Sequence, residues 1–329
     1  MKKALVRSAH PFFKNNYLFY NRDVIKKHPL VRPWLVLYDE LQRYGIELVT
    51  KDCQKSREAY AFELQIDTSE AIDIPNIGIH LESPAVIPTL AEREFWDQSD
   101  HVFTWLKVFN EEKFIQINHP TTVEEVRSSG PKLYEYCLIS ARKSNENGRL
   151  IGYDIRDSYL RHARELKLPL RLYGRGWDKF VGDTRLKRMA NRLIPAWALR
   201  VNPFPELHFG EIDKKEPIIG HSKFTFAIEN TDGYENYVSE KIIDALRCYS
   251  LPLYWGHEAV RKYIPDDIFI DLKNFDSPVE LFHFCNTLSA ADYCGYIHRI
   301  KRFLQGGGLH PFSPEAFAKK LVSNILCRI

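Results

Sequence analysis

Short apolar runs of strand type alternate with amphipathic helical segments along most of the chain, and this alternation restricts the possible folds more than any other feature. A helical pattern at residues 34–44, for example, separates the first two runs. The runs of the first part are 4–7, 46–50, 61–66, 77–81, 102–105 and 114–117. Strands that alternate with helices are typical of an open α/β sheet.

A second series of the same kind follows a polar, turn-rich segment at residues 118–132, which we interpret as a linker. Two helical patterns end the chain, and Ser313 with Pro314 predicts the start of the last helix. The sequence therefore predicts an α/β protein with two Rossmann-like domains facing each other across a cleft, at residues 1–125 and 126–300, and a closing helix at 301–329. The strands of the second domain are expected near 135–140, 170–173, 224–228, 252–254 and 268–270.

The composition excludes several classes of protein. At 329 residues with 44% hydrophobic content, the chain can bury two cores. Its formal net charge of +3 argues against a surface devoted to nucleic acid. No apolar segment approaches the roughly 18 to 20 residues of a membrane span. The six cysteines form neither C-x-x-C nor a Cys/His cluster, which predicts neither a zinc site nor a disulfide framework and favours a cytoplasmic location.

The stretch FAIENTDGYENYVSEKIIDALRCYSLPLYWG at residues 226–256 carries more polar chemistry than a strand-to-helix connection needs. Ser239 is placed to cap a helix whose first turn holds Glu240 and Lys241. A helix N-terminus suits a phosphate, and a carboxylate beside it can accept hydrogen bonds from ribose hydroxyls. The alternative is that Glu240 only complements the helix dipole and Lys241 is solvated.

The order of residues in this stretch resembles the signature of glycosyltransferase family 10, the α-1,3/4-fucosyltransferases. The shared pattern is F-x-x-E-N, a polar loop, Y-V-S-E-K, an apolar helix and L-P-L-Y-W-G, with Ser239 where the family usually has threonine. The resemblance implies GDP-fucose as donor, with Glu240 facing the ribose, Lys241 the phosphates and Tyr237 packed nearby. The donor-binding residues that it implies are Arg156, Glu229, Asn230, Tyr237, Ser239, Glu240 and Lys241.

Arg156 enters this set through a second match. The segments IRDSYLRHAREL at 155–166 and LYGRGW at 172–177 resemble the family's phosphate-binding helix and the strand after it. Asp154 is placed to cap that helix and to leave Arg156 in its first turn. The alternative is a surface arginine paired with Asp157. The expected buried face of the helix is Tyr159, Leu160, Ala163 and Leu166.

A carboxylate is expected at the end of a strand in the first domain, within NIGIHLESPAVIP at residues 76–88. We predict that the strand ends at Glu82 and that a helix starts at Ser83 and Pro84. Ligands of open α/β sheets bind outside the carboxyl ends of the strands. The segment resembles the family's E-S-P motif, whose glutamate is the proposed general base, which implies that role for Glu82. The alternative is that Glu82 caps the next helix or bonds His80.

No D-x-D triplet occurs in the chain, so the metal-bridging motif of the other common glycosyltransferase architecture is absent. Arg156, Lys241 and a helix N-terminus are expected to stabilise the leaving diphosphate instead. The sequence therefore predicts no required cofactor and no metal site, while stimulation by Mn²⁺ or Mg²⁺ stays open.

Residues 184–200 form a basic amphipathic pattern without a single acid. Such a helix can pack on the core, lie on an anionic membrane or contact the acceptor, and the sequence leaves these three open. Its apolar positions at helical spacing are Leu186, Met189, Ala190, Leu193, Ile194 and Trp197.

The resemblance as a whole implies a GT-B fold and an inverting transfer of L-fucose from GDP-β-L-fucose to a hydroxyl of an oligosaccharide or lipid-linked, lipopolysaccharide-type glycan. Glu82 would be the base, with the acceptor bound by residues 1–125 and the donor by 126–300. We expect a cytoplasmic protein at the inner face of the membrane, in peripheral contact with anionic lipid and without a nucleic-acid partner. The alternatives are transfer of another GDP-linked deoxy sugar, and a non-catalytic glycan- or membrane-binding module of the same fold.

Overall fold

A computed structural model describes residues 1–23, 31–107, 111–126, 131–143, 150–180, 184–195 and 201–328 of the chain. Internal contacts divide the chain into two compact units. Unit 1 comprises Met1–Val123, Tyr234–Glu240 and Leu309–Ile329, and unit 2 comprises Glu124–Gly233 and Lys241–Gly308. The three-part domain division expected from the sequence stays a prediction, because compactness alone does not show which segments fold independently.

Unit 1 is built on a six-stranded parallel sheet with the order β2-β1-β3-β4-β5-β6. Each strand expected in this part of the chain is confirmed, with ends that differ by at most two residues. Apolar alternation and β-branched residues are therefore sufficient to find these strands. The strands are β1 (Lys2–Ser8), β2 (Ile46–Thr50), β3 (Glu63–Ile66), β4 (Asn76–His80), β5 (His101–Thr104) and β6 (Phe114–Gln116).

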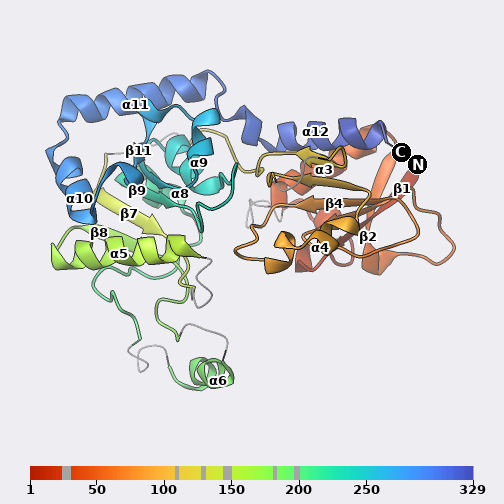
Figure 1. Cartoon of the computed structure of the whole chain (residues 1–329), viewed down its shortest axis with the longest axis horizontal. Helices are drawn as coiled ribbons and strands as arrows, with labels where there is room; N and C mark the ends of the chain where they lie inside the picture. The colour runs from red at the N-terminus through yellow and green to blue at the C-terminus, as the bar shows by residue number, and fades with distance from the viewer. Residues whose placement is uncertain are drawn as a thin grey trace. The chain divides into compact units, whose positions relative to one another are not determined.

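Helices α3 (Arg32–Arg43) and α12 (Pro314–Leu326) lie side by side and contribute to the core of unit 1 (Figure 1). The ring of Trp34 meets that of Phe317 edge to face, at 5.5 Å between centroids. The predicted cap is confirmed, because Ser313 Oγ accepts a hydrogen bond from the Ala316 N–H at 3.0 Å. Shorter helices complete the unit: α1 (Tyr17–Tyr20), α4 (Arg93–Asp97), η1 (Pro11–Phe13), η3 (Lys51–Cys53), η4 (Pro88–Ala91) and η8 (His310–Phe312).

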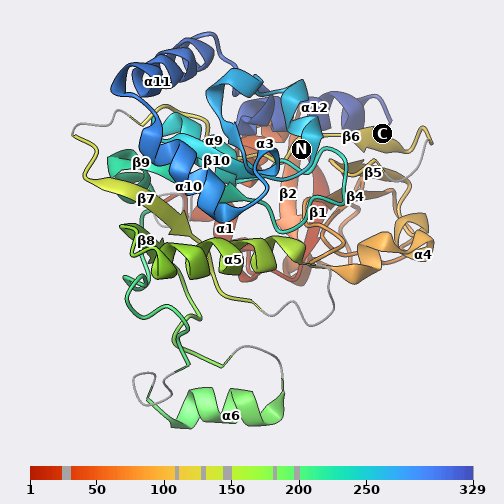
Figure 2. The same cartoon turned by 60° about the vertical axis from the view of Figure 1, so that its left-hand side comes forward.

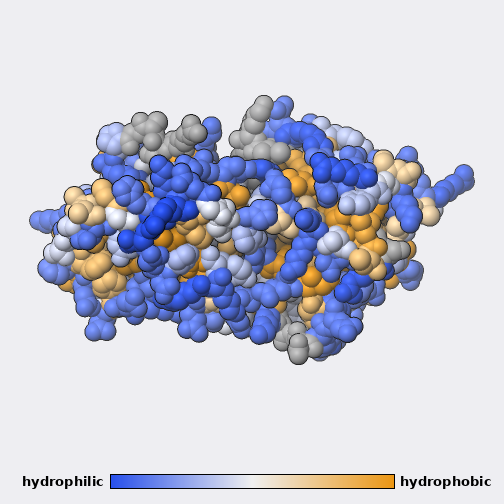
Figure 3. All heavy atoms as spheres, turned by 90° about the horizontal axis from the view of Figure 1, so that it is seen from above, coloured by the Kyte–Doolittle hydropathy of each residue, from blue (hydrophilic) through white to orange (hydrophobic). Residues whose placement is uncertain are grey.

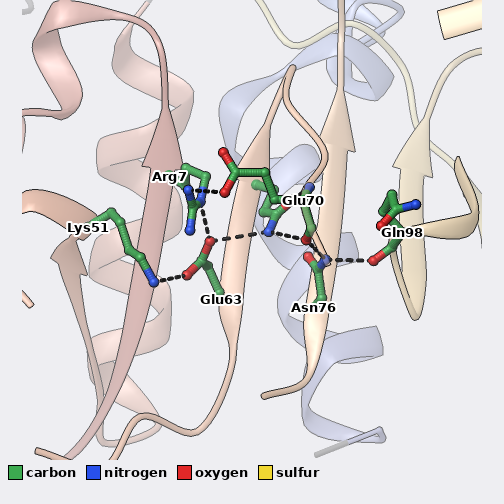
Figure 4. Close-up of polar contacts among 7 residues, drawn as sticks. Arg7, Lys51, Glu63, Glu70, Asn76 and Gln98 are labelled. Atoms are coloured by element: carbon green, nitrogen blue, oxygen red, sulfur yellow. Dashed lines mark hydrogen bonds and ion pairs between the residues drawn. The ribbon is translucent and has the colours of Figure 1, made fainter. Parts of the chain in front are cut away.

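A network of polar side chains crosses β1, β3 and β4 on one face of the same sheet (Figure 4). The carboxylate of Glu63 is fully buried and receives hydrogen bonds from Arg7 Nε at 2.6 Å and Lys51 Nζ at 2.8 Å. Burial alone would raise the pKa of Glu63, but the two cations hold it below its ordinary value. Asn76 extends the network by donating to the main-chain oxygens of Glu70 and Gln98, each at 2.8 Å. This face is therefore fixed by charge pairing as well as by apolar packing.

Unit 2 contains a five-stranded parallel sheet with the order β11-β10-β9-β7-β8. All five expected strands are confirmed, although the last one starts two residues later than predicted. The strands are β7 (Tyr134–Ile139), β8 (Leu170–Tyr173), β9 (Ser222–Ile228), β10 (Leu251–Trp255) and β11 (Ile270–Asp271). The helices are α5 (Ile151–Glu165), α6 (Arg185–Leu193), α8 (Glu216–His221), α9 (Glu240–Arg247), α10 (Pro278–Thr287), α11 (Ala290–Gln305), η5 (Glu258–Lys262), η6 (Asp266–Ile268) and η7 (Leu272–Asn274).

The two sheets share one topology. In each of them the second strand of the unit lies on one side of the first, and the later strands follow on the other side. The chain therefore reverses the direction in which it adds strands between β1 and β3 in unit 1, and between β7 and β9 in unit 2. Ligands of open α/β sheets bind outside the carboxyl ends of the strands at such a switch point.

Polar and charged side chains cover most of the face in Figure 3, with smaller apolar areas between them. Among the described helices, none combines the length and the apolar character that crossing a bilayer requires. Helix α6 is unusual because Leu186 and Leu193 are 74% and 71% exposed. The alternative that this helix packs on the core is therefore wrong for these side chains, and Trp197 lies outside the described residues.

Candidate functional site

The switch point of unit 2 holds Arg156, which lies in the second turn of α5. Its Nη1 donates to Ser140 Oγ at 3.1 Å, and its Nη2 donates to Asn230 Oδ1 at 3.1 Å and to the main-chain oxygen of Ile228. These partners follow or end β7 and β9, so the guanidinium lies between the two strand ends. The alternative of a surface arginine is wrong, because Arg156 is only 3% exposed.

Two donor groups of Arg156 remain for a ligand. A guanidinium carries about five N–H groups. Three of them are used in the bonds to Ser140, Ile228 and Asn230, and within the described parts of the chain the Nε–H and one Nη1–H have no acceptor. The ring of Tyr153 packs 4.4 Å from the guanidinium carbon and fixes its plane. A phosphate could accept the remaining N–H groups from a cation that is already oriented.

The start of α5 differs from the prediction. The helix begins at Ile151, and no side-chain hydrogen bond caps it, so Arg156 does not lie in the first turn as expected. Gly152 fixes the start instead, since its N–H donates to the main-chain oxygen of Asn230 at 3.0 Å. A Cβ at Gly152 would lie 1.7 Å from the main-chain oxygen of Glu229, so only glycine permits this approach. Tyr159, Leu160 and Ala163 are buried as predicted, whereas Leu166 is exposed.

Lys241 and Glu229 form an ion pair beside this group. Lys241 Nζ donates to Glu229 Oε2 at 3.1 Å, and the carboxylate is fully buried whereas the lysine side chain is 21% exposed. A Cβ at Gly256 would lie 3.0 Å from Glu229 Cγ, so the glycine gives the carboxylate its space. A buried carboxylate requires a partner, and Glu229 therefore holds the partly exposed ammonium group in place.

The remaining donor-binding candidates lie at three positions. Asn230 is bonded to Arg156 and follows Glu229 directly. Glu240 is the first residue of α9, directly after Ser239, so the helix starts where the sequence predicts. The ring of Tyr237 packs against that of Trp105 at 4.8 Å between centroids, in an apolar cluster of unit 1.

Sequence reasoning missed several residues at the carboxyl edge of the unit 2 sheet. Ser140 directly follows β7 and accepts from Arg156. A Cβ at Gly174, whose φ is +138°, would lie 2.1 Å from the main-chain oxygen of Ser140, so the glycine of LYGRGW is needed for this approach. Lys273 follows β11 and donates to Asp232 Oδ2 at 2.6 Å. The sequence could have indicated these residues only by their position, because each of them comes directly after or near the end of a strand.

Glu82 lies two residues beyond β4 at the carboxyl edge of the unit 1 sheet, and it is exposed. The strand ends at His80 rather than at Glu82, and Ser83 opens a single turn instead of the predicted helix. The alternative bond to His80 is wrong, because among the described residues both ring nitrogens of this buried histidine lack a partner. The alternative that Glu82 caps a helix fails as well, since the next helical turn starts only at Pro88.

Asp67 is a second carboxylate at this edge that sequence reasoning missed. It follows β3 directly and has a φ of +50°. Its Oδ1 accepts hydrogen bonds from the N–H groups of Leu81 at 2.9 Å and Glu82 at 3.3 Å, so it holds the backbone at Glu82. Burial, together with the charge of Glu82, raises the pKa of Asp67 to about 6 despite these two hydrogen bonds.

The chemistry of the two edges differs. Unit 2 presents the guanidinium of Arg156 and the ammonium of Lys241, which suit a diphosphate. Unit 1 presents the exposed carboxylate of Glu82, which can accept a proton. No three histidine, cysteine or carboxylate side chains come together as a metal site within the described ranges.

Solved structures with the same fold were found for most of the chain. A crystal structure of α1,3-fucosyltransferase with GDP matches with a TM-score of 0.56 at 13% identity, over 90% of this chain and 81% of that one. A sucrose-phosphate synthase from Thermosynechococcus elongatus matches with a TM-score of 0.57 at 10% identity, over 99% of this chain and 98% of that one. At such identities the likeness concerns the fold alone. Two parallel-sheet α/β units of this kind define the GT-B class of glycosyltransferase folds.

Sequence similarity to a known family is found in one segment of the chain. Residues 198–303 match the model of the glycosyltransferase family 10 (fucosyltransferase) C-terminal domain. Over 79 residues the chain is 37% identical to an α-(1,3)-fucosyltransferase of Helicobacter pylori, which is 23% of this chain and 16% of that protein. Over 63 residues it is 43% identical to an α-(1,4)-fucosyltransferase of Arabidopsis thaliana, which is 19% of this chain and 16% of that protein. The chain thus matches about a sixth of the length of these curated relatives.

Proposed function

We propose that the protein is a fucosyltransferase that uses GDP-β-L-fucose as donor and transfers L-fucose, with inversion, to a hydroxyl of an oligosaccharide. One observation carries the proposal: the guanidinium of Arg156 is fixed at the switch point of unit 2, beside the Lys241–Glu229 pair, and this pair lies in the segment that matches the family 10 model. The identity of fucose as the transferred sugar is supported by the similar proteins, which are an α-(1,3)- and an α-(1,4)-fucosyltransferase. A crystal structure of α1,3-fucosyltransferase with GDP-fucose, at 15% identity, supports the class of donor.

The mechanism assigns one role to each edge. The carboxylate of Glu82 takes the proton of the acceptor hydroxyl as its oxygen attacks C1 of fucose. The bond between C1 and the β-phosphate oxygen breaks, and its electron pair stays on GDP. Arg156 and Lys241 stabilise the negative charge that develops on the leaving diphosphate, while Glu240 accepts hydrogen bonds from the ribose.

Neighbouring residues orient the side chains to which the mechanism assigns a role. Ser140 and Asn230 orient Arg156, and Glu229 orients Lys241. Asp67 fixes the backbone from which Glu82 extends. Orientation by buried neighbours keeps charged groups ready before the substrate arrives, which lowers the reorganisation needed in the transition state. We propose a lipid-linked, lipopolysaccharide-type glycan as acceptor, and action at the cytoplasmic face of the membrane.

The test is transfer by the purified chain. A library of oligosaccharide acceptors is incubated with GDP-fucose, with and without a chelator, and the products are measured by mass spectrometry. We expect a mass increase of one deoxyhexose on at least one acceptor and release of GDP. Glu82→Gln removes the base at an exposed position, so we expect transfer to fall by about 10²–10⁴-fold while GDP affinity and thermal stability stay unchanged.

Two outcomes contradict the proposal. If the protein turns over GDP-mannose or GDP-colitose in preference to GDP-fucose, its donor is another GDP-linked sugar. Absence of transfer to every acceptor, with GDP bound normally, would support the non-catalytic module. Glu111→Gln is the matched control, because Glu111 is an exposed glutamate of the same unit that pairs with Arg93.

A further inference from the structure

Helix α6 presents an apolar face to solvent. Leu186, Met189 and Leu193 are 74%, 50% and 71% exposed, and Ile194, directly after the helix, is 43% exposed. Spacings of three, four and seven residues place the three helical side chains on one face. Thr184 caps the helix by accepting a hydrogen bond from the Lys187 N–H at 3.3 Å, so the face belongs to a regular helix.

Basic residues border this face. Arg185 and Arg192 are exposed, and they lie four residues before and three residues after Met189, so they flank one border of the apolar face. The chain has no aspartate or glutamate between Thr184 and Arg200. A partner that binds here therefore contacts an apolar stripe with positive charge beside it. An acidic protein surface would match the positive charge but not the apolar stripe.

Among the described residues of unit 2, the contacts of α6 lie on its polar side. Asn191 bonds the backbone of Phe180 through both its N–H and its oxygen, each at 2.9 Å, and thus ties the polar side of the helix to the preceding segment. In Figures 1 and 2, α6 is drawn apart from the sheet of its own unit. Asn191 lies on the opposite side of the helix from Leu186 and Leu193, so its bonds to Phe180 leave these two leucines accessible.

We propose that α6 docks on the surface of an anionic phospholipid bilayer. Leu186, Met189 and Leu193 enter the boundary between headgroups and acyl chains, and Arg185 and Arg192 lie at the lipid phosphates. Charge complementarity selects this partner over a neutral lipid surface. The proposal is independent of fucosyl transfer, although an acceptor attached to lipid would be found at the same surface.

The test is flotation of the full-length chain with vesicles. We expect the protein to float with vesicles of phosphatidylglycerol and phosphatidylcholine, and to float much less with phosphatidylcholine alone or at high salt. Leu186→Glu and Leu193→Glu should each lower the partition coefficient by about tenfold or more. Because both leucines are exposed, the variants should unfold at the same temperature as the wild type.

Leu133→Glu is the matched control. This leucine is 59% exposed and lies before β7, so the variant makes the same chemical change outside α6, and we expect unaltered flotation. Three results would overturn the proposal: no flotation of the wild type, equal flotation with neutral vesicles, or equal loss in Leu133→Glu. A dimer in sedimentation that Leu193→Glu converts to a monomer, without vesicle binding, would assign the face to a second copy of the chain instead. Loss of binding with normal GDP-fucose turnover on a soluble acceptor separates this proposal from the proposed function.

Discussion

At the residue scale, Lys241 has a proposed role in donor binding and a structural role as the ion-pair partner of Glu229. A test of the donor site must separate these two roles. The ammonium group of Lys241 is proposed to meet the diphosphate, yet it also neutralises the fully buried carboxylate of Glu229. Removing one partner of a buried pair leaves an uncompensated charge, which destabilises a protein more than the pair itself stabilises it. A simple loss of activity in Lys241→Ala would therefore not distinguish donor binding from folding.

We expect Lys241→Met to lower the free energy of unfolding by about 3 kcal/mol, because the buried carboxylate of Glu229 loses its ion pair with Lys241. The double variant Glu229→Gln/Lys241→Met removes both charges and should recover most of that stability. It should still bind GDP about tenfold or more weakly, since the contact to the phosphates is lost. Denaturant unfolding and calorimetric titration with GDP measure the two effects. Wild-type GDP affinity in the double variant would show that Lys241 has a structural role alone.

Asp67→Asn tests the partly buried carboxylate that accepts hydrogen bonds from the N–H groups of Leu81 and Glu82. The pKa of Asp67 is raised from 3.8 to about 6 in the folded protein, so the folded state binds the proton more tightly than the unfolded state. Stability contributed by this group is therefore lost as pH rises from about 4 to 6. Asparagine keeps an oxygen for the N–H groups of Leu81 and Glu82, and we expect the variant to be more stable than the wild type by about 2 kcal/mol at pH 8. The difference should vanish below pH 4, as thermal unfolding across pH would show.

The same variant should transfer fucose more slowly, because a destabilising charge kept next to a base is typical of functional sites. Asp97→Asn is the control, since hydrogen bonds from Arg93 and Lys113 lower the pKa of this exposed carboxyl against the effect of desolvation. Its effect on stability at pH 8 should have the opposite sign or be negligible. Equal turnover in Asp67→Asn and the wild type would contradict a role for the charge.

The sequence points to Arg156, Glu229 and Lys241 because they stand at fixed positions in motifs that determine local structure, and their role in donor binding stays a prediction. Asp67 could not be found in this way. Its burial and its bonds to Leu81 and Glu82 depend on the pairing of β3 with β4, which no local pattern reports. Residues whose surroundings come from a single segment are therefore predictable, whereas those whose surroundings come from several strands are not.

At the scale of elements, the same distinction explains which predictions hold. The strands in the described part of the chain follow from apolar alternation, which is a local property. The start of α5 was missed because it is set by Gly152 against the backbone of Glu229 and Asn230, far away in the sequence. The exposed face of α6 was likewise unpredictable, since an amphipathic pattern is the same in a core helix and in a helix that lies on a surface.

Helix α12 can be tested at the scale of elements. Its apolar side chains belong to the core of unit 1, whereas α11, the α-helix before it in the chain, belongs to unit 2. Phe317 is 4% exposed and packs on Trp34. Phe317→Ala should lower the free energy of unfolding of unit 1 by about 3–5 kcal/mol, the usual effect of a large cavity. Leu326→Ala is the control on the same helix, since Leu326 is 38% exposed and its change should have little effect.

Denaturant unfolding followed by circular dichroism measures the loss. GDP binding to the folded variant should change little, because the bond of Arg156 to Asn230 and the pair of Lys241 with Glu229 lie within unit 2. An equal loss of stability in Leu326→Ala would show that α12 contributes through its helix as a whole. Weakened GDP binding in Phe317→Ala would show that the donor site depends on the core of unit 1.

At the scale of the whole molecule, each unit has its own sheet and its own buried core. Chains built in this way often unfold in more than one step, because two-state behaviour is a property of single domains. Arg156, Glu229 and Lys241, which we propose bind the donor, all bond to partners in unit 2. A ligand that binds them stabilises that unit directly, whereas it reaches unit 1 only through coupling between the two.

We expect calorimetry of the wild type to show two unfolding transitions, only one of which moves with GDP. At a GDP concentration about 100 times its dissociation constant, the stabilisation of that transition is about 2.7 kcal/mol. Arg156→Lys keeps the charge but loses the forked donor geometry, so the same GDP concentration should produce a smaller shift of the same transition. Phe317→Ala should lower the other transition alone. A single transition that rises with GDP and falls in Phe317→Ala would contradict this division and show instead that the two units unfold as one cooperative body.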